Sequence, residues 1–359
     1  MARFFPFCMP RLIIIYICVL LGSIARVANA QSDTLLSHRH TLMFWNVENA
    51  FWPDDDPERQ DDDFTPQGLR RWNMSRLKQK LTQLTKGILA AGSGQPPMAV
   101  GLAEVEGDSV MRYWLRQPAL YELNYRYVMS DVADARGIKT ALLYQPTEFR
   151  LISHASHSIP MPAGRRATRQ LLHVAGRVVS GDTLDLIVVH LPSQLGGARQ
   201  SQGARDGAHR ALMQLADSLR QAREHPYVVI MGDMNEAPSR RHRWWEQGHS
   251  AGWHNLMLPL ERQLPRRPSM YGSHKYQGEW SFLDQFIVSE SLLNDGKASG
   301  DATRAAVRAG NARSFSLPFM LTTDENYLGH RPKRAYSGAQ YEGGVSDHLP
   351  ILLDLEVYF

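Results

Sequence analysis

Short apolar runs, bounded by polar and turn-forming residues, recur along most of this chain. Runs of five to seven such residues, rich in β-branched and aromatic side chains, are typical of buried β-strands. We therefore expect strands at residues 41–47, 98–102, 125–129, 140–144, 184–189, 227–231 and 282–288. A further apolar run, residues 351–353, follows a polar segment near the C-terminus and predicts one more strand.

Two longer segments have apolar residues at helical spacing. The first, residues 66–91, carries one apolar face made of Leu77, Leu81, Leu84 and Ile88. The second, residues 205–222, carries a stripe made of Ala208, Leu212, Leu215 and Leu219. Strands outnumber helices and only part of the order alternates strand, helix, strand. The pattern therefore favours an α+β fold, a layered α/β sandwich, over a doubly wound sheet or a barrel.

The domain organisation follows from the absence of any repeat, low-complexity linker or boundary in the sequence. Residues 31–359 are expected to form one domain with a single large core. Residues 290–344 are weakly patterned and rich in Gly, Arg and Ser. We interpret them as a surface excursion near the functional site rather than as a second domain.

The first thirty residues have the pattern of a secretory signal peptide. Arg3 and Arg11 precede a short apolar run, residues 12–21, and Val-Ala-Asn-Ala then predicts cleavage after Ala30. The run is short for a bilayer span, so no stable membrane anchor is expected after cleavage, although an uncleaved anchor is the alternative. The mature protein is therefore predicted to be periplasmic or secreted, and monomeric.

Removal of this leader changes both the cysteine content and the charge. The two cysteines, Cys8 and Cys18, lie in the leader, so the mature chain has no disulfide, thiolate metal site or cysteine nucleophile. The formal charge of +4 also falls, because three arginines and no acid leave with the leader. A mature chain near neutrality gives no argument from global charge for nucleic-acid binding.

Polar residues suited to metal binding or proton transfer stand at the ends of the apolar runs. They form five clusters, which contain Asn46; Glu104 and Glu106; His190; Asp233 and Asn235; and Asp284 with Asp347 and His348. Each cluster alone also has an ordinary structural explanation, such as a polar turn, a buried ion pair or a hydrogen-bonded core histidine. The acidic runs at 54–56 and 61–63 are interpreted as solvated loop.

Several of these residues need a partner if they are buried. A carboxylate such as Glu104 inside an apolar strand end costs several kcal/mol unless a cation or hydrogen-bond donor compensates it. Asp233 and Asn235, two residues apart, project to one side and could orient water beside a phosphate. Asp284 and His348 could form an acid–histidine pair. Hard oxygen ligands favour Mg²⁺ or Mn²⁺ over zinc.

In their order along the chain, these motifs resemble those of the endonuclease/exonuclease/phosphatase superfamily. The matching positions are Asn46, Glu104, His190, Asp233-x-Asn235, Asp284 and Asp347-His348, and the resemblance covers residues 41–359. It implies a four-layer sandwich of two face-to-face mixed β-sheets flanked by helices. It also implies a metal-dependent phosphoric ester hydrolase with its site at one edge of the sheets.

The resemblance implies a role for each matching residue. Glu104 would bind the metal, with Asn46 and Asp347 as direct or water-mediated ligands. Asp233 would activate the attacking water and Asn235 would hold it. His348, oriented by Asp284, would polarise the phosphate. His190 would stabilise or protonate the leaving oxygen.

Two further residues match patterns of a subgroup of that family. Arg136 could reach the substrate phosphate, and Trp280 could line the site; a structural arginine and a core tryptophan are the alternatives. One or two metal ions remain possible on this sequence.

The substrate expected first is nucleic acid, cleaved by a secreted or periplasmic nuclease. Residues 240–245 (Arg-Arg-His-Arg-Trp-Trp) place basic and aromatic groups just after Asp233, and residues 165–166 and 331–334 add arginine and lysine. A phospholipid head group or small phosphate ester would use the same chemistry and is the second interpretation. A non-catalytic binding protein on the same scaffold is the third.

Overall fold

The computed structural model describes residues 37–358, apart from 93, 132–133, 163–167, 194–197, 240–243, 247–251, 268 and 294–306, and apart from the side chains of 198–200. Ser37–Phe359 form one compact unit. The predicted signal peptide lies outside the described residues. None of the helices described is long and apolar enough to cross a membrane.

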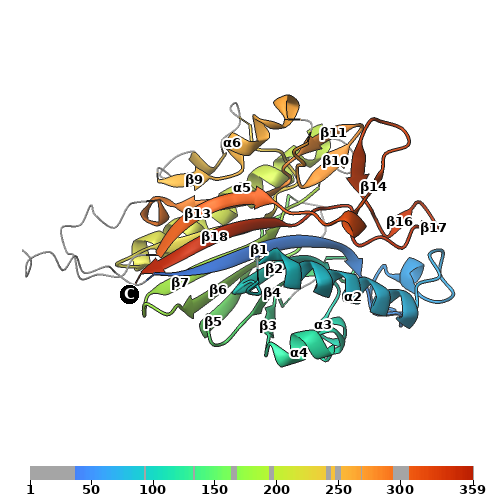
Figure 1. Ribbon diagram of the computed structural model, residues 1–359, viewed down its shortest axis with the longest axis horizontal. Coiled ribbons are helices and arrows are strands. Elements are labelled where there is room, and N and C mark those ends of the chain that lie inside the picture. The colour runs from blue at the N-terminus through green and yellow to red at the C-terminus, as the bar shows by residue number, and fades with distance from the viewer. Residues whose placement is uncertain are drawn as a thin grey trace, which may run out of the picture. The chain divides into compact units, whose positions relative to one another are not determined.

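Two six-stranded mixed sheets organise this unit (Figure 1). The first contains, in spatial order, β13 (Val307–Ser314), β18 (Ile351–Tyr358), β1 (Ser37–Ala50), β2 (Ala99–Val105), β4 (Lys139–Tyr144) and β3 (Arg126–Met129). The second contains β5 (Arg150–His157), β6 (Leu171–Arg177), β7 (Thr183–His190), β8 (Tyr227–Asp233), β12 (Asp284–Ser289) and β9 (Trp253–Asn255). The pairs β1–β2 and β7–β8 are parallel and the other pairs are antiparallel.

Helices cover the outer faces of both sheets. They are α2 (Met74–Ala91), α3 (Asp108–Leu115), α4 (Pro118–Glu122), α5 (Ala198–Ala222) and the short α6 (Leu258–Glu261). Three small hairpins pair β10 (His274–Tyr276) with β11 (Glu279–Ser281), β14 (Leu321–Thr323) with β15 (His330–Pro332), and β16 (Tyr336–Ser337) with β17 (Gln340–Tyr341). Single 3₁₀ turns span Asp62–Phe64, Trp244–Glu246, Leu264–Arg266, Glu290–Leu292 and Pro318–Met320.

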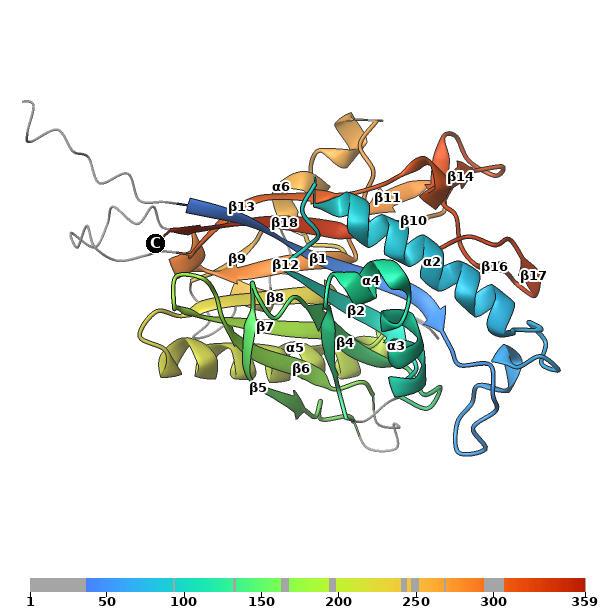
Figure 2. The same cartoon turned by 60° about the horizontal axis from the view of Figure 1, so that its bottom comes forward.

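Three apolar layers fill the spaces between these elements. Alternate residues of β1 point to opposite sides, so Leu42 and Phe44 lie between the sheets while Met43 and Trp45 face α2 and α3. Figure 2 shows α2 and α3 over β1, β2 and β4. On the other side, α5 packs against β7 and β8. The predicted sandwich of two facing sheets with outer helices is thus confirmed.

Several element boundaries differ from the sequence prediction. Helix α2 begins at Met74 instead of residue 66, because the Asn73 side chain accepts hydrogen bonds from the backbone N–H groups of Ser75 and Arg76 and so caps the helix there. Strands β5 and β6 were not predicted. The interpretation of residues 290–344 as surface excursion was wrong in part, because β13 pairs with β18 inside the first sheet.

Glycines set the close approach of some core side chains. A Cβ atom added to buried Gly176 of β6 would lie only 2.2–2.5 Å from three ring carbons of Phe149. Neither the strand nor the fully buried ring can move away without disturbing the layer between the sheets. Glycine at this position therefore allows Phe149 to pack flat against the strand.

We expect Gly176→Ala to destabilise the fold by about 1–3 kcal/mol through this overpacking. Gly203→Ala is the control, because Gly203 is exposed in α5 and an added Cβ would meet no atom within 4 Å. The control should be neutral or slightly stabilising, since alanine favours the helix. Denaturant unfolding of both variants tests this, and equal stabilities would contradict the packing argument.

Candidate active site

The ends of β1 and β2 depart from regular strand geometry where the predicted residues lie. The β1–β2 register shifts between Asn46 and Ala50, and the β2–β4 register shifts between Ala103 and Val105. Glu48, Asn49 and Glu104 have positive φ angles of 50°, 56° and 66°. Such conformations cost on the order of 1–3 kcal/mol each and concentrate at functional sites.

Asn46 joins carboxylates from the two sheets. Its Nδ2 donates to Asp233 Oδ2 at 3.1 Å and lies 3.4 Å from Glu104 Oε1. The Asn49 backbone N–H donates to Glu104 Oε2 at 3.0 Å. Asn46 and Glu104 belong to the first sheet and Asp233 to the second. These contacts therefore bring residues at the strand ends of both sheets together in one site.

Asp233 is buried at the end of β8, opposite Asp284 of β12. The Asn235 backbone N–H donates to Asp233 Oδ1 at 2.8 Å, while the Asn235 side chain donates to the Leu191 carbonyl. Burial raises the pKa of Asp233 to about 7; the charge of His348 opposes this rise and that of Asp284 adds to it. Burial is thus the main reason why the pKa of Asp233 is raised.

His348 and Asp284 form the predicted acid–histidine pair. His348 Nδ1 lies 2.7 Å from Asp284 Oδ2, and His348 Nε2 lies 3.9 Å from Asp233 Oδ2. Burial alone would lower the pKa of His348, but the carboxylates of Asp284, Asp233 and Asp347 raise it well above its usual value. The Ser346 hydroxyl, which donates to the Asn46 carbonyl at 2.6 Å, fixes this loop against β1.

His190 completes the group from the end of β7. Its Nε2 lies 3.7 Å from Asp233 Oδ2 and 3.8 Å from Glu104 Oε1. Burial and the positive charges of Arg169 and Arg136 lower the pKa of His190 well below its usual value. Arg169 also donates to the backbone carbonyls of His190 and Leu191, at 3.2 and 2.9 Å. The imidazole is therefore held neutral and in a fixed position.

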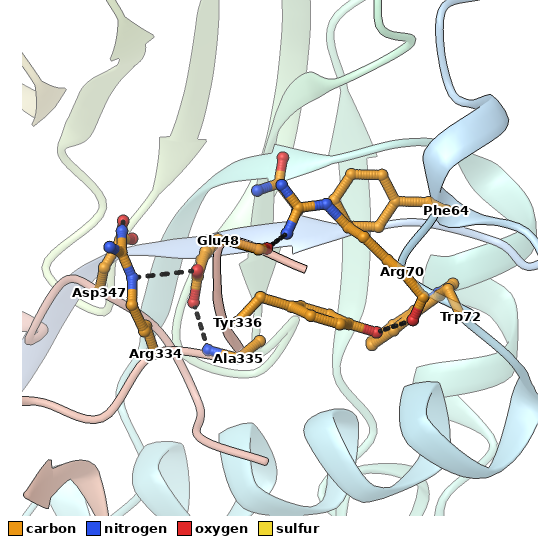
Figure 3. A pocket seen from close by; sticks show the side chains of 10 residues that line it. Glu48, Phe64, Arg70, Trp72, Arg334, Ala335, Tyr336 and Asp347 are labelled. Atoms are coloured by element: carbon orange, nitrogen blue, oxygen red, sulfur yellow. Dashed lines mark hydrogen bonds and ion pairs between the residues drawn. The ribbon is translucent and has the colours of Figure 1, made fainter. Parts of the chain in front are cut away.

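Asp347 lies in a second charged group beside the first. Its Oδ2 accepts from Arg334 Nη2 at 2.6 Å, and Arg334 Nε lies 3.8 Å from Glu48 Oε1 (Figure 3). Burial and Asp347 raise the pKa of Glu48 to about 8. Lys80, fully buried in α2, donates to the Val345 carbonyl at 2.6 Å, and burial lowers its pKa.

A pocket of about 180 Å³ opens beside this second group. Besides Glu48, Arg334 and Asp347, its lining includes a basic side chain and three aromatic rings: Arg70, Phe64, Trp72 and Tyr336. The Arg70 guanidinium lies 4.9 and 5.0 Å from the ring centres of Phe64 and Tyr336. Figure 3 shows these side chains around the opening. The pocket therefore places the Arg70 guanidinium, which covers buried aromatic rings, near the carboxylates of Glu48 and Asp347.

The two residues predicted to contact substrate differ in position. Arg136 donates to Asn49 Oδ1 at 3.3 Å and to Asp134 at 3.4 Å, with 41% of its side chain exposed, so it lies at the rim of the site. Trp280 is half-buried, packs against the core and lies 5.0 Å from the Tyr271 ring.

Other expectations require correction. Trp244 and Trp245 are buried against α5, with Trp244 stacked on His209, so they cannot stack on a nucleic-acid strand. Residues 165–166 and 240–243 lie outside the described residues. Asp61 is not solvated loop: it is buried, and burial raises its pKa.

The comparisons with known proteins agree with this geometry. The sequence profile of the Endonuclease/Exonuclease/phosphatase family matches residues 41–357. The chain belongs to this family. None of the curated proteins compared with the chain matches it.

Solved structures with the endonuclease/exonuclease/phosphatase fold are distant in sequence. Danio rerio TDP2 in complex with a single-strand DNA product has 17% identity and a TM-score of 0.53, over 88% of this chain and 98% of that one. The human Nocturnin catalytic domain with a bound sulfate has 16% identity and a TM-score of 0.54, over 91% and 98%. A Bacteroides thetaiotaomicron mannosyl-6-phosphatase has 13% identity and a TM-score of 0.53, over 88% and 99%. At these identities the likeness shows the fold.

The donor set fits a divalent cation. Asp233, Asp284 and His348 offer ligand atoms within 4.8 Å of one another. One carboxylate oxygen of Asp284 is buried without a hydrogen-bond partner in the described structure. Glu104 adds a further carboxylate beside Asp233 through Asn46. Oxygen-rich sites of this kind suit hard ions such as Mg²⁺.

Two charged residues that support the site were not identified from the sequence: Arg169 and Lys80. Lys80 had a usable signal, because it lies three residues after Leu77 and four before Leu84, on the apolar face of the helix. A lysine at such a position is buried and must find an acceptor or anion. Arg169 had no comparable signal, since its partners Asp134 and His190 are distant in sequence.

We expect Lys80→Met to destabilise the protein by about 1–3 kcal/mol, since it leaves the buried Val345 carbonyl without its donor and removes one of the two cations near Glu48. Lys86→Met on the exposed face of α2 is the control and should change stability by less than about 0.5 kcal/mol. Thermal and denaturant unfolding measure both. A Lys80 variant as stable as the control would show that the buried ammonium contributes nothing.

Proposed function

We propose that this chain is a divalent-metal-dependent phosphodiesterase that hydrolyses its substrate by in-line attack of water. One observation carries the proposal: a buried carboxylate, Asp233, lies within 3.1–3.9 Å of an amide and two imidazoles, those of Asn46, His190 and His348. Three proton-handling groups and an amide donor around one small volume suit an attacking water and a phosphoryl group.

In this mechanism each side chain has a role that follows from its position. Asp233 orients the attacking water and accepts its proton, and Asn235, fixed by its hydrogen bond to Leu191, holds that water. His348, whose Nδ1 is paired with Asp284, donates a hydrogen bond from Nε2 to a phosphoryl oxygen. His190, also beside Asp233, donates a hydrogen bond from its neutral ring to the leaving oxygen while the bond between that oxygen and phosphorus breaks, and the leaving oxygen then takes up a proton from solvent.

Glu104 and Asn46 would hold the metal ion, with Asp347 as a further ligand, either directly or through water; Asp233 is the carboxylate in contact with Asn46. Mg²⁺ or Mn²⁺ is the ion we propose from the oxygen ligands. When bound, the ion supplies Lewis-acid stabilisation of the charge that develops on the phosphoryl oxygens.

Nucleic acid is the substrate we propose first. The pocket beside Asp347 is lined by Arg70, which lies over the buried rings of Phe64 and Tyr336, so a phosphate of the substrate would meet positive charge there. The rim position of Arg136 supports a further phosphate contact. TDP2, with the same fold, has been solved with a single-strand DNA product.

A small phosphate ester is the second candidate. The same pocket measures only about 180 Å³, and Arg331 and Arg334 are already paired with Glu342 and Asp347. These pairs leave less positive charge for a long polyanion. A mannosyl-6-phosphatase shares the fold.

The decisive test of the chemistry uses residues 31–359 with linear and circular DNA, RNA, sphingomyelin, a sugar phosphate and a chromogenic phosphodiester. We expect Mg²⁺-dependent hydrolysis that chelation abolishes and that Asp233→Ala reduces by at least about 10²-fold. Asp55→Ala, in the exposed acidic loop, should retain wild-type activity. Turnover that survives complete chelation would refute the metal-dependent mechanism.

Salt dependence separates the two substrates. Nucleic-acid cleavage should weaken steeply between about 50 and 200 mM salt because phosphate contacts release counterions, whereas a small ester loses little. Arg70→Gln should raise KM for an oligonucleotide more than for a chromogenic monoester. Flat salt profiles on every substrate, with the sugar phosphate preferred, would favour the small-ester activity instead.

We also propose, from the leader sequence, that the mature enzyme begins at Gln31, is exported and acts as a monomer. N-terminal sequencing of the protein from cell fractions, with size-exclusion chromatography, tests these three statements.

A further inference from the structure

A second cluster of possible metal ligands lies at the opposite end of β1 from the active site. His38 and His40 are two residues apart, so their side chains leave the strand on the same face. Glu148 reaches them from the connection between β4 and β5. One ligand atom from each of the three residues lies within 4.8 Å of the others. Six residues of strand separate His40 from Asn46, which is roughly 20 Å.

The contacts within this cluster are too long for strong hydrogen bonds. Glu148 Oε2 lies 3.5 Å from His40 Nδ1 and 3.8 Å from His38 Nδ1. The two imidazole rings lie 4.4 Å apart at an angle of 73°, so they do not stack. The side chains thus converge on a common volume without bonding tightly to one another.

His40 is the buried member, with 5% of its surface exposed. Its Nε2 atom is buried and has no hydrogen-bond partner in the described structure. Because Nδ1 is the ring nitrogen that faces Glu148, at 3.5 Å, an ion held between the three side chains would bind Nδ1, and Nε2 would carry the ring proton.

We propose that His38, His40 and Glu148 bind a divalent transition-metal ion of the zinc class. Two imidazole nitrogens and one carboxylate oxygen form a common three-residue ligand set for Zn²⁺, which leaves a fourth position for water. Mg²⁺ prefers oxygen ligands and would not compete well here. The cluster opens onto a cavity of about 620 Å³, which gives an ion and its water access from solvent.

The ion would act on the fold rather than on the reaction. It would join the start of β1, in the first sheet, to the connection that leads into β5 of the second sheet. It would thereby close the end of the sandwich that the active-site contacts do not hold together. An ion that binds only the folded chain stabilises it by mass action.

The test uses metal-free full-length mature chain in excess Mg²⁺, so that oxygen-rich sites are filled with Mg²⁺. We expect calorimetric titration to detect one equivalent of bound Zn²⁺ and a Zn²⁺-dependent rise in Tm. Co²⁺ in its place should give the visible absorption of a low-symmetry nitrogen and oxygen site. Binding by His38→Ala and by Glu148→Gln should be weaker by at least about tenfold.

His154→Ala is the matched control, because His154 is an exposed histidine on β5 outside the cluster, and this variant should bind Zn²⁺ as the wild type does. Mg²⁺-dependent phosphoesterase activity of the His38 and Glu148 variants should also stay unchanged, since neither residue touches the active site. His38 and Glu148 are both partly exposed, so neither substitution should disturb the core. A variant that loses Zn²⁺ binding but keeps the circular dichroism spectrum of the wild type has therefore lost a ligand and has not misfolded. Unchanged Zn²⁺ affinity in both variants would overturn the proposal.

Discussion

The hydrogen bond from Asn46 to Asp233 is the contact on which the site depends. It joins the end of β1 in one sheet to the end of β8 in the other, and it brings Glu104 to the same amide. Every other member of the group is then placed by the strand that carries it: His190 by β7 and Asp284 by β12. A shift of one sheet against the other would separate donor from acceptor, so the packing between the sheets is a requirement of the chemistry.

That packing also explains why strained backbone is tolerated at the site. The layer between the sheets is apolar and closely fitted, with Gly101 and Gly176 where a Cβ atom would collide with neighbouring side chains. Burial of this apolar layer stabilises the fold, and this stability offsets the cost of the positive φ angles at Glu48 and Glu104. The bulges then turn carboxylates out of the apolar strands and into the site.

The sequence predicts the parts of this molecule that depend on local pattern. Buried runs such as 227–231 are strands, and the polar residues that end them meet as expected. Strand β5 was not predicted because it is an exposed edge strand without an apolar alternation, and β13 because its residues are small and charged. The hydrogen bond from the Lys80 ammonium to the Val345 backbone carbonyl was not predicted, because 265 positions separate the two residues and pairing at that range is a property of the fold.

The positions of the lysine, arginine and histidine side chains bear on the site proposed for the metal ion. Glu48 and Asp347 have Arg334 and Lys80 beside them, and these side chains compensate their charge. Among the described residues, Glu104 and Asp233 have ion-pair contacts with histidines only. His190 is kept neutral by burial and nearby arginines, whereas His348, whose pKa is raised by three carboxylates, lies 3.9 Å from Asp233 and is shared with Asp284 and Asp347. Buried carboxylates without a fixed cation are stable only if they take up protons or a metal ion. In the mechanism proposed above, a bound divalent ion would supply the remaining positive charge beside Glu104 and Asp233.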